Sequence, residues 1–331
     1  MHKRQNALHN WLIQTLDSTD FSLNLLAGDA SFRKYYRLIF QDISRIVMDA
    51  PPQQEALKPF IEIAGFFRTH GLLTPKVYAV NELEGFALLD DFGDTLLLHH
   101  LTVENTDNLY TTAIKVLLKI QQCPLENGYP FPRFDKQFMQ NELNLFRQWF
   151  LDAYLKLKLS SKEKNLIQTT FNWLIAEIEK QPKVVIHRDY HSRNIMLSGA
   201  EFNHQLALID FQDAMIGPVT YDLVSLLKDC YIQWPREQIL RWLLIFYEYS
   251  PYTKQWSFSD FLRAFDLCGL QRHLKVLGIF CRLHLRDNKP SYLHDLPLTL
   301  HYVTACAEDY EELKSFYHFL QTRVKLPCIL Q

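Results

Sequence analysis

The sequence predicts an α+β fold of two lobes: a small lobe built on an antiparallel β-sheet, and a larger lobe that is mostly helical. The chain has 331 residues, which is more than one hydrophobic core usually serves. Short strand-like runs dominate its beginning, and helical periodicity dominates most of the remainder. The expected lobes are residues 1–93 and residues 94–331.

The composition is that of an ordinary globular protein, because hydrophobic residues make up 48% of the chain and charged residues 22%. A formal net charge of -2 gives no general attraction to nucleic acid or to anionic lipid. The apolar runs are too short for a membrane helix. Six scattered cysteines without a C-x-x-C motif indicate free thiols rather than a zinc site. We therefore expect a cytoplasmic protein with no nucleic acid, membrane or obligate protein partner.

The small lobe should begin with an amphipathic helix over the first sixteen residues, where apolar side chains recur at helical spacing. Runs rich in β-branched and aromatic residues then alternate with turn residues, which predicts strands. One helical run, residues 53–71, interrupts the strands and ends at a glycine, a common helix terminator. The expected strands are residues 21–26, 32–40, 44–50, 73–81 and 85–93.

The larger lobe should be helical from about residue 95 to residue 182. Ser160 and Ser161 are candidate N-caps for one of these helices, because a serine hydroxyl can accept a hydrogen bond from a free backbone N–H group there. Short strands and a polar loop are expected at 184–197 and 206–211. From Thr220 to the end, the pattern is again helical.

A burst of polar residues separates two apolar runs in "VVIHRDYHSRNIML", residues 184–197. A lone Asp or Asn after a strand is most often a turn residue that binds its own backbone. Here, however, the segment from His187 to Asn194 matches H-R-D-x-x-x-x-N letter for letter. Asp210 and Phe211 then match the first two letters of D-F-G. The combination indicates phosphoryl transfer from ATP.

The chemistry of that transfer explains the residue types. Negative charge concentrates at the γ-phosphate, so catalysis depends on positioning and on charge stabilisation. Mg²⁺ prefers oxygen ligands, which we expect Asn194 and Asp210 to supply. A separate carboxylate has to accept the proton of the acceptor hydroxyl, and Asp189 is the residue expected to do so.

These segments resemble the kinase-like small-molecule phosphotransferases, the aminoglycoside phosphotransferase and choline kinase family. "IHRDYHSRNIML" and "LALIDFQDAMIGPVTYDLVSLLKD" carry the resemblance. The second of these stretches is especially similar to one branch, the bacterial anomeric kinases that act on N-acetylmuramate and N-acetylglucosamine in peptidoglycan recycling, and "GDASFRKYYRL" and "IVMDAPP" in the small lobe also resemble that branch. The resemblance covers essentially the whole chain. It implies a protein-kinase-like bilobal fold, ATP and Mg²⁺ as cofactors, a small-molecule sugar as acceptor, and a role for Asp222 in buttressing the catalytic loop.

The expected nucleotide-binding residues lie in two stretches of the small lobe. The first replaces the glycine-rich loop of protein kinases and holds a single glycine. Its backbone N–H groups could still bind a phosphate, although a simple turn is the alternative reading. In the second, the strand that leads to the expected hinge between the lobes near residues 90–94, backbone groups would hold the adenine. The residues concerned are Gly28, Asp29, Ala30 and Ser31 in the first stretch and Asp90, Asp91 and Phe92 in the second.

The third strand departs from the kinase pattern, because Met48 stands where protein kinases carry a lysine that contacts the phosphates. Methionine cannot neutralise a phosphate. Arg33 on the adjacent strand is the candidate replacement, because it is the cation nearest the turn. A solvated strand cation is the alternative reading of Arg33, and a non-catalytic nucleotide-binding scaffold would follow if no cation served.

A new helix begins about ten residues after Asp210, so no long activation segment exists on which a protein substrate could dock. A small acceptor is therefore favoured. By resemblance this is an amino sugar, and an aminoglycoside or an amino alcohol is the alternative. An aminoglycoside is a polycation and would require an acidic pocket, whereas an anionic sugar would require cations. The helical lobe offers such cations, which weakly favours an anionic sugar: Arg133, Arg282, His284 and Arg286.

Overall fold

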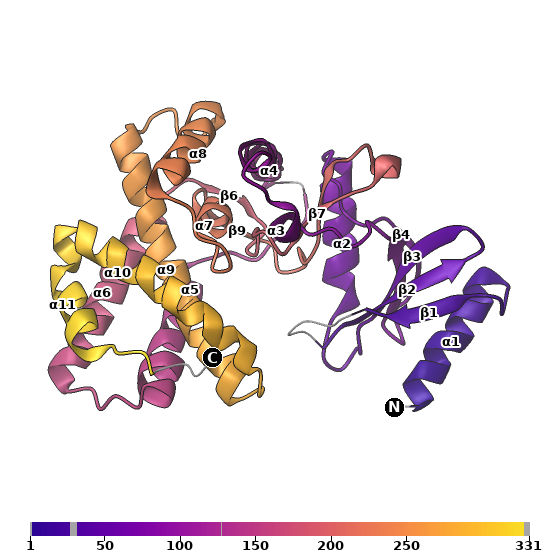
Figure 1. The fold of residues 1–331 in the computed structure, drawn as a ribbon, viewed down its shortest axis with the longest axis horizontal. Helices are drawn as coiled ribbons and strands as arrows, with labels where there is room; N and C mark the ends of the chain where they lie inside the picture. The colour runs from indigo at the N-terminus through magenta and orange to yellow at the C-terminus, as the bar shows by residue number, and fades with distance from the viewer. Residues whose placement is uncertain (1, 27–31, 127, 328–331) are drawn as a thin grey trace. The chain divides into compact units, whose positions relative to one another are not determined.

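The computed structural model describes residues 2–26, 32–126 and 128–327 (Figure 1). The contacts divide the chain into two compact units. The first comprises Met1–His100, Glu126–Tyr129 and Arg193–Asp213, and the second comprises Leu101–Leu125, Pro130–Ser192 and Ala214–Gln331. The lobe boundary expected at residues 93 and 94 stays a prediction.

A five-stranded antiparallel sheet organises the first unit, with the strand order β1-β2-β3-β5-β4. Helix α1, His2–Leu16, covers one face: its Leu8, Trp11 and Leu12 are buried against side chains of the sheet. Residues 28–31, where the sequence predicted a turn, lie outside the described residues. The strands are β1 (Ser22–Leu25), β2 (Lys34–Phe40), β3 (Ile43–Asp49), β4 (Val77–Asn81) and β5 (Phe86–Asp90).

Helix α2, Leu57–Thr69, also belongs to the first unit, and its Phe60 stacks on Phe211 at a centroid distance of 5.0 Å. A two-stranded hairpin completes this unit. Strands β7, Ile195–Leu197, and β8, Leu206–Leu208, pair antiparallel. The short helix α3 (Leu97–His100) and the 3₁₀ turn η2 (Ala200–Phe202) lie in this unit as well.

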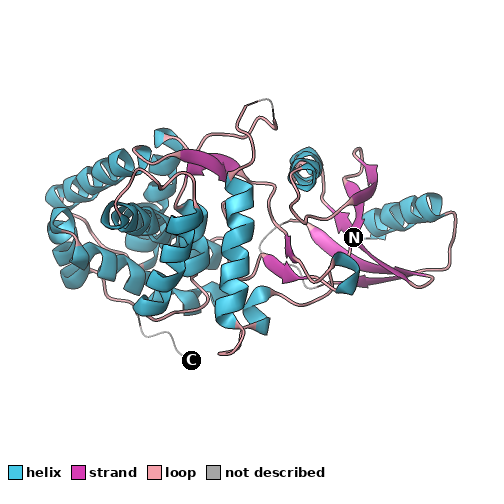
Figure 2. Cartoon of the chain, turned by 90° about the horizontal axis from the view of Figure 1, so that it is seen from above, coloured by secondary structure: helices cyan, strands magenta, loops and turns pink. Residues whose placement is uncertain are grey.

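Helices predominate in the second unit (Figure 2). The predicted N-cap Ser160 closes a full capping box with Glu163 at the start of α6. Strands β6 (Lys183–Ile186) and β9 (Met215–Pro218) pair antiparallel. The helical elements are α4 (Thr106–Gln121), α5 (Lys136–Leu145), η1 (Phe146–Tyr154), α6 (Ser161–Glu179), α7 (Tyr221–Leu227), α8 (Arg236–Tyr249), α9 (Phe258–Leu285), η3 (Pro290–Asp295), α10 (Leu296–Asp309), η4 (Glu311–Leu313) and α11 (Lys314–Arg323).

The 28-residue helix α9 is buried along most of its length and packs beside α5 and the π-helix η1. Gly278 permits this packing, because a Cβ atom there would lie 2.3 Å from the carbonyl carbon of Leu145. A methyl group at this position would force the two elements apart. The close approach aligns α9 with the segment that carries Glu142, and this alignment shapes the site described below.

The observed elements confirm the predicted fold class, a small antiparallel sheet with a larger helical part. Helix and strand positions match the expected runs, with ends that differ by a few residues, except that strand β9 was not among the expected strands. Among the described residues, no helix is both long enough and apolar enough to cross a membrane.

Candidate active site

The predicted catalytic loop begins where strand β6 ends, at Ile186, and it belongs to the second unit up to Ser192. Arg188 adopts a left-handed backbone conformation with φ of 76°. Such a conformation is unfavourable for a residue with a side chain, so the surrounding contacts have to hold it. The strained turn lifts the next residue, Asp189, off the path of the strand.

Two carboxylates beyond β9 tie this loop down. Asp222, in the first turn of α7, accepts hydrogen bonds from the backbone N–H groups of His187 at 2.6 Å and of Arg188 at 3.0 Å. Asp229 accepts hydrogen bonds from the backbone N–H group and the hydroxyl of Ser192, at 3.0 and 2.5 Å. Asp222 thus buttresses the loop, as the resemblance implied. Burial raises the pKa of Asp222 to about 7, against the opposing effect of its two backbone hydrogen bonds.

Helix α9 supplies the contacts that hold Asp189. The guanidinium of Arg272, which is only 5% exposed, donates to the carbonyl of Arg188 at 2.7 Å and lies 3.4 Å from the Asp189 carboxylate. One turn further along α9, Lys275 pairs with Glu142 of α5 at 3.2 Å, and Arg188 pairs with the same carboxylate. The loop is therefore held by a buried network in which cations outnumber carboxylates around Asp189.

The side chain of Asp189 is 33% exposed, so an acceptor can reach it. Its burial alone would raise its pKa. The positive charges of Lys275, Arg272, His191 and Arg188 outweigh that effect and hold the pKa of Asp189 well below its ordinary value. The carboxylate is consequently ionised at every physiological pH, and it can accept a proton in a transition state.

The two predicted metal ligands come together in the first unit, at the open end of the hairpin β7–β8. Asn194 precedes β7 and Asp210 follows β8, and the backbone N–H group of Ile209 donates to the Asn194 carbonyl. The Asn194 amide nitrogen lies 3.4 Å from an oxygen of Asp210. The hairpin register therefore places an amide and a carboxylate side by side, although sixteen residues separate them.

The residues around this pair fit a hard divalent cation. The amide oxygen of Asn194 and the carboxylate of Asp210 are ligand types that Mg²⁺ prefers. Gln212 donates to the Asp210 carboxylate at 2.8 Å. Its own side-chain oxygen is buried and has no hydrogen-bond partner among the described residues. A buried oxygen without a partner, on the residue that donates to the Asp210 carboxylate, is consistent with a cation near this pair.

Arg33, the candidate replacement for the missing lysine, is only 7% exposed and pairs with Glu55 just before α2 at 2.9 Å. This burial argues against the reading of a solvated strand cation. Met48 is fully buried in the sheet opposite Tyr35. Burial raises the pKa of Tyr35 to about 12, and the charges of Arg33, Asp210 and Glu55 all act on its phenol. Arg33 and the candidate metal ligand Asp210 therefore act electrostatically on the same tyrosine.

The side chains of the residues expected to hold adenine make contacts within the first unit. Asp90 accepts hydrogen bonds from the Tyr78 hydroxyl and the Lys76 N–H group. Asp91 accepts from Arg37, and Phe92 packs edge-to-face on a ring of η2. Burial raises the pKa of Asp91, but its hydrogen bonds from Arg37, from a serine hydroxyl and from a backbone N–H group hold it below the ordinary value. Only backbone groups here remain candidates for the nucleotide. The predicted phosphate-loop residues Gly28, Asp29, Ala30 and Ser31 lie outside the described residues.

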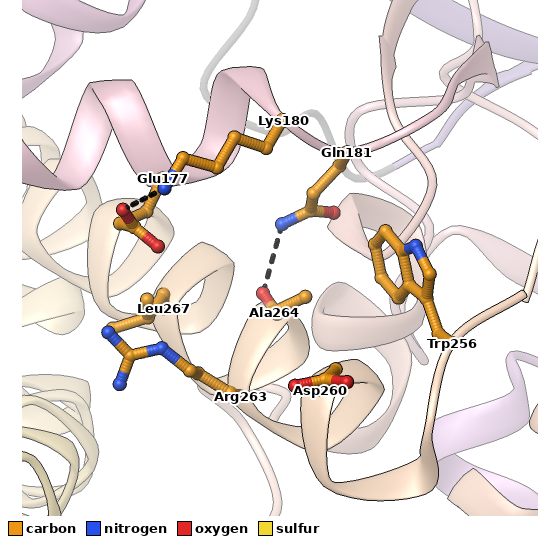
Figure 3. A pocket seen from close by; sticks show the side chains of 8 residues that line it. All are labelled: Glu177, Lys180, Gln181, Trp256, Asp260, Arg263, Ala264 and Leu267. Atoms are coloured by element: carbon orange, nitrogen blue, oxygen red, sulfur yellow. Dashed lines mark hydrogen bonds and ion pairs between the residues drawn. The ribbon is translucent and has the colours of Figure 1, made fainter.

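A separate cavity of about 270 Å³ opens in the second unit, beside the first turns of α9 (Figure 3). Its charged groups are already engaged: Lys180 pairs with Glu177 at 2.5 Å, and Arg263 pairs with Glu312 at 2.8 Å. The lining ends on α9 at Leu267, five residues before Arg272, and none of the residues that hold Asp189 lines this cavity. Its lining comprises Glu177, Lys180, Gln181, Trp256, Asp260, Arg263, Ala264 and Leu267.

Sequence reasoning missed Arg272, Lys275, Glu142 and Glu55 as parts of the site. A usable signal existed for the first two. The stretch "LQRHLKVLG" places cations in an otherwise apolar helix, and a buried charge has to be paired. Nothing in the sequence marks Glu142 or Glu55 as their partners.

Comparison with known proteins agrees with the fold and the motifs. Residues 22–255 match the model of the phosphotransferase enzyme family. The chain is 36% identical to an N-acetylmuramate/N-acetylglucosamine kinase of Neisseria meningitidis serogroup B, over 96% of this chain and 95% of that protein. It is 38% identical to a kinase of the same name from Pseudomonas putida, over 85% of this chain and 82% of that protein.

A solved structure of an aminoglycoside phosphotransferase, APH(2'')-Ib with ADP bound, superposes with a TM-score of 0.61 at 15% identity, covering 89% of this chain and 97% of that one. That likeness confirms the protein-kinase-like fold. Fold and motifs together define a phosphotransferase. The chain belongs to the phosphotransferase enzyme family that includes the aminoglycoside phosphotransferases, and the predicted resemblance is confirmed.

Proposed function

We propose that this protein is an ATP-dependent kinase that phosphorylates the anomeric hydroxyl of N-acetylmuramate and N-acetylglucosamine, in peptidoglycan recycling. The observation that carries the substrate assignment is the 36% and 38% identity to two kinases of that name, spread over most of the chain. A reaction that consumes ATP is expected to take place in the cytoplasm.

Asp189 is the proposed base. As the anomeric oxygen forms its bond to the γ-phosphorus, Asp189 takes the hydroxyl proton, the bond from the γ-phosphorus to the bridging oxygen breaks, and ADP leaves. An anomeric hydroxyl is more acidic than an ordinary alcohol, so a carboxylate with a low pKa suffices. The contacts from Arg272 and Asp222 support this role, because they fix the loop on which Asp189 stands.

Asn194 and Asp210 are the proposed Mg²⁺ ligands, and the cation would neutralise charge on the phosphates of the nucleotide. Arg33 is the proposed cation for the phosphates in place of the lysine that Met48 replaces. Its pair with Glu55 corresponds to the lysine–glutamate pair that protein kinases require. The backbone groups of Gly28, Asp29, Ala30 and Ser31, and those of Asp90, Asp91 and Phe92, remain the proposed sites for phosphate and adenine.

The electrostatics around Asp189 weigh against a polycationic acceptor such as an aminoglycoside. Three cations act on Asp189: Arg188 and Lys275, which share Glu142 as their counter-charge, and Arg272, which pairs with Asp189 itself. An acceptor rich in ammonium groups would meet repulsion there. A non-catalytic scaffold is disfavoured as well, because such a protein has no need for a tethered and ionised Asp189.

The test is ADP release with a panel of acceptors: N-acetylmuramate, N-acetylglucosamine, glucose and an aminoglycoside. We expect turnover with the two N-acetylated sugars and little with glucose, because a site that binds the N-acetyl group leaves polar atoms unpaired when that group is missing. The matched control is Asp189→Asn, which keeps the shape of the side chain and removes the base. Turnover of the aminoglycoside alone would refute the proposal.

A further inference from the structure

A row of cations follows one face of helix α9. Arg272, Lys275, Arg282 and Arg286 are separated by three, seven and four residues, with Ile279 in the gap. Intervals of three and four keep side chains on the same face of a helix. Exposure rises along the row: Arg272 and Lys275 are buried, Arg282 is half-buried, and Arg286 is exposed. The row therefore leads from the proposed base toward solvent.

Three members of the row have counter-charges. Arg272 pairs with Asp189 at 3.4 Å, and Lys275 pairs with Glu142 at 3.2 Å. Arg286 donates two hydrogen bonds to Asp287, at 2.8 and 2.9 Å. Their charges are therefore balanced within the second unit.

Arg282 differs from the other three. Its guanidinium forms no ion pair with any described residue, and its Nε atom is buried without a hydrogen-bond partner among them. Burial and the neighbouring charge of Arg286 lower the pKa of Arg282, while Asp287 acts in the opposite direction. A half-buried cation in this position loses hydration free energy, and no ion pair with a described residue offsets that loss. An anion that binds here would relieve that cost.

The spacing along α9 fits a monosaccharide that carries an acid group. Arg282 follows Lys275 by seven residues, or about two helical turns and ~10 Å along the axis. Side chains on a helix tend to lean toward its N-terminus, which on α9 is the direction in which Lys275 and Arg272 lie. An acceptor whose hydroxyl meets Asp189 would thus present a substituent of sugar size to Arg282.

We propose that Arg282 binds the carboxylate of an N-acetylmuramate-type acceptor and so determines the preference of the enzyme for an acidic sugar over its neutral counterpart. The inference rests on the proposed function and adds to it a specificity-determining residue. N-acetylglucosamine has no carboxylate, so its use should not depend on Arg282. A planar guanidinium suits this task, because it can donate two parallel hydrogen bonds to a carboxylate.

The test compares kcat/KM for N-acetylmuramate and N-acetylglucosamine in the full-length protein and in Arg282→Met. We expect kcat/KM for N-acetylmuramate to fall about tenfold to hundredfold, mainly through KM, and that for N-acetylglucosamine to change less than about twofold. Arg282→Lys should recover part of the loss, because lysine restores the positive charge but cannot donate two parallel hydrogen bonds to a carboxylate. The matched control is Arg263→Met on the same helix, which removes an arginine paired elsewhere and should leave the ratio of the two sugars unchanged.

Each outcome separates the inference from the function on which it rests. If kcat/KM fell equally for both sugars in Arg282→Met, Arg282 would support the fold. If kcat/KM changed for neither sugar, Arg282 would not bind the carboxylate. Either result overturns the inference while the sugar kinase stands. If the wild-type protein phosphorylates neither sugar, the proposed function fails and the inference falls with it.

Discussion

Replacement of Arg272 by methionine should reduce both stability and turnover, because this side chain holds the catalytic loop from α9. Its hydrogen bond to the Arg188 carbonyl spans 2.7 Å, and a charged hydrogen bond of this kind contributes about 1.5–3 kcal/mol. The contact with Asp189 at 3.4 Å involves a carboxylate that is a third exposed, so it adds no more than ~1 kcal/mol. Arg272 also donates to the hydroxyl of Tyr221 at 3.3 Å, but that hydroxyl keeps a second donor, Lys275, at 3.2 Å.

These contributions predict that Arg272→Met lowers the free energy of unfolding by about 2–4 kcal/mol. The substitution should also lower kcat, for a reason separate from the loss of stability. Arg188 is held at a φ of 76°, and its release would let Asp189 move. Because a misplacement of about 1 Å can cost ~10²-fold in rate, we expect kcat to fall by that order while KM for ATP changes little.

The pH profile gives a readout that a purely structural role would not move. Arg272 is one of the charges that depress the pKa of Asp189. Its removal raises that pKa, so the acid limb of kcat/KM should shift to higher pH, in the direction of the ordinary value of ~3.9. Urea titration measures stability and an ADP-release assay measures turnover, with Arg263→Met as the control. Where Arg272→Met fails to fold, Arg272→Lys takes its place. A variant with unchanged kcat and an unchanged unfolding midpoint would refute the reasoning.

Five further substitutions test the three remaining roles: the base, the metal ligands and the cation for the phosphates. Asp189→Asn should lower kcat about 10²-fold or more with nearly unchanged ATP binding, as measured by steady-state kinetics and calorimetry; near wild-type turnover would rule out the base. Asp210→Ala should abolish the Mg²⁺ dependence of nucleotide binding in calorimetry, and Asn194→Ala should have a milder effect because water can replace a neutral ligand. Arg33→Met should raise KM for ATP about tenfold or more, whereas Arg33→Lys should recover part of the loss; equal KM values in both variants and wild type would remove Arg33 from the phosphate site.

Much of the fold was predictable because local patterns specify it. The strands of the first unit are short β-branched and aromatic runs between turn residues, and the capping box at Ser160 and Glu163 is a local signal. Asp189, Asn194 and Asp210 could be singled out as candidates from the sequence, because the proposed phosphoryl transfer requires those residue types in that order. The pairing of β7 with β8 then brings Asn194 beside Asp210.

The supporting contacts were not predictable in the same way, because they join residues far apart in the chain. Arg272 reaches Asp189 across 83 residues, and Gln271 reaches Glu142 across 129. The π-helix η1 has no distinctive sequence signal either. Gly278 lets α9 pack closely against the start of η1, because it has no side chain. In a sequence, however, a lone glycine in a helical pattern indicates only a less stable helix.

The position of the transferred phosphate tests the central claim most directly. The protein is incubated with ATP, Mg²⁺ and N-acetylglucosamine, and in parallel with the 1-O-methyl glycoside of the same sugar, and both mixtures are followed by phosphorus NMR. The free sugar should give a sugar 1-phosphate, and the glycoside should give no new sugar phosphate, because its anomeric oxygen carries no proton for Asp189 to accept. A product phosphorylated at position 6, from either compound, would contradict the anomeric assignment.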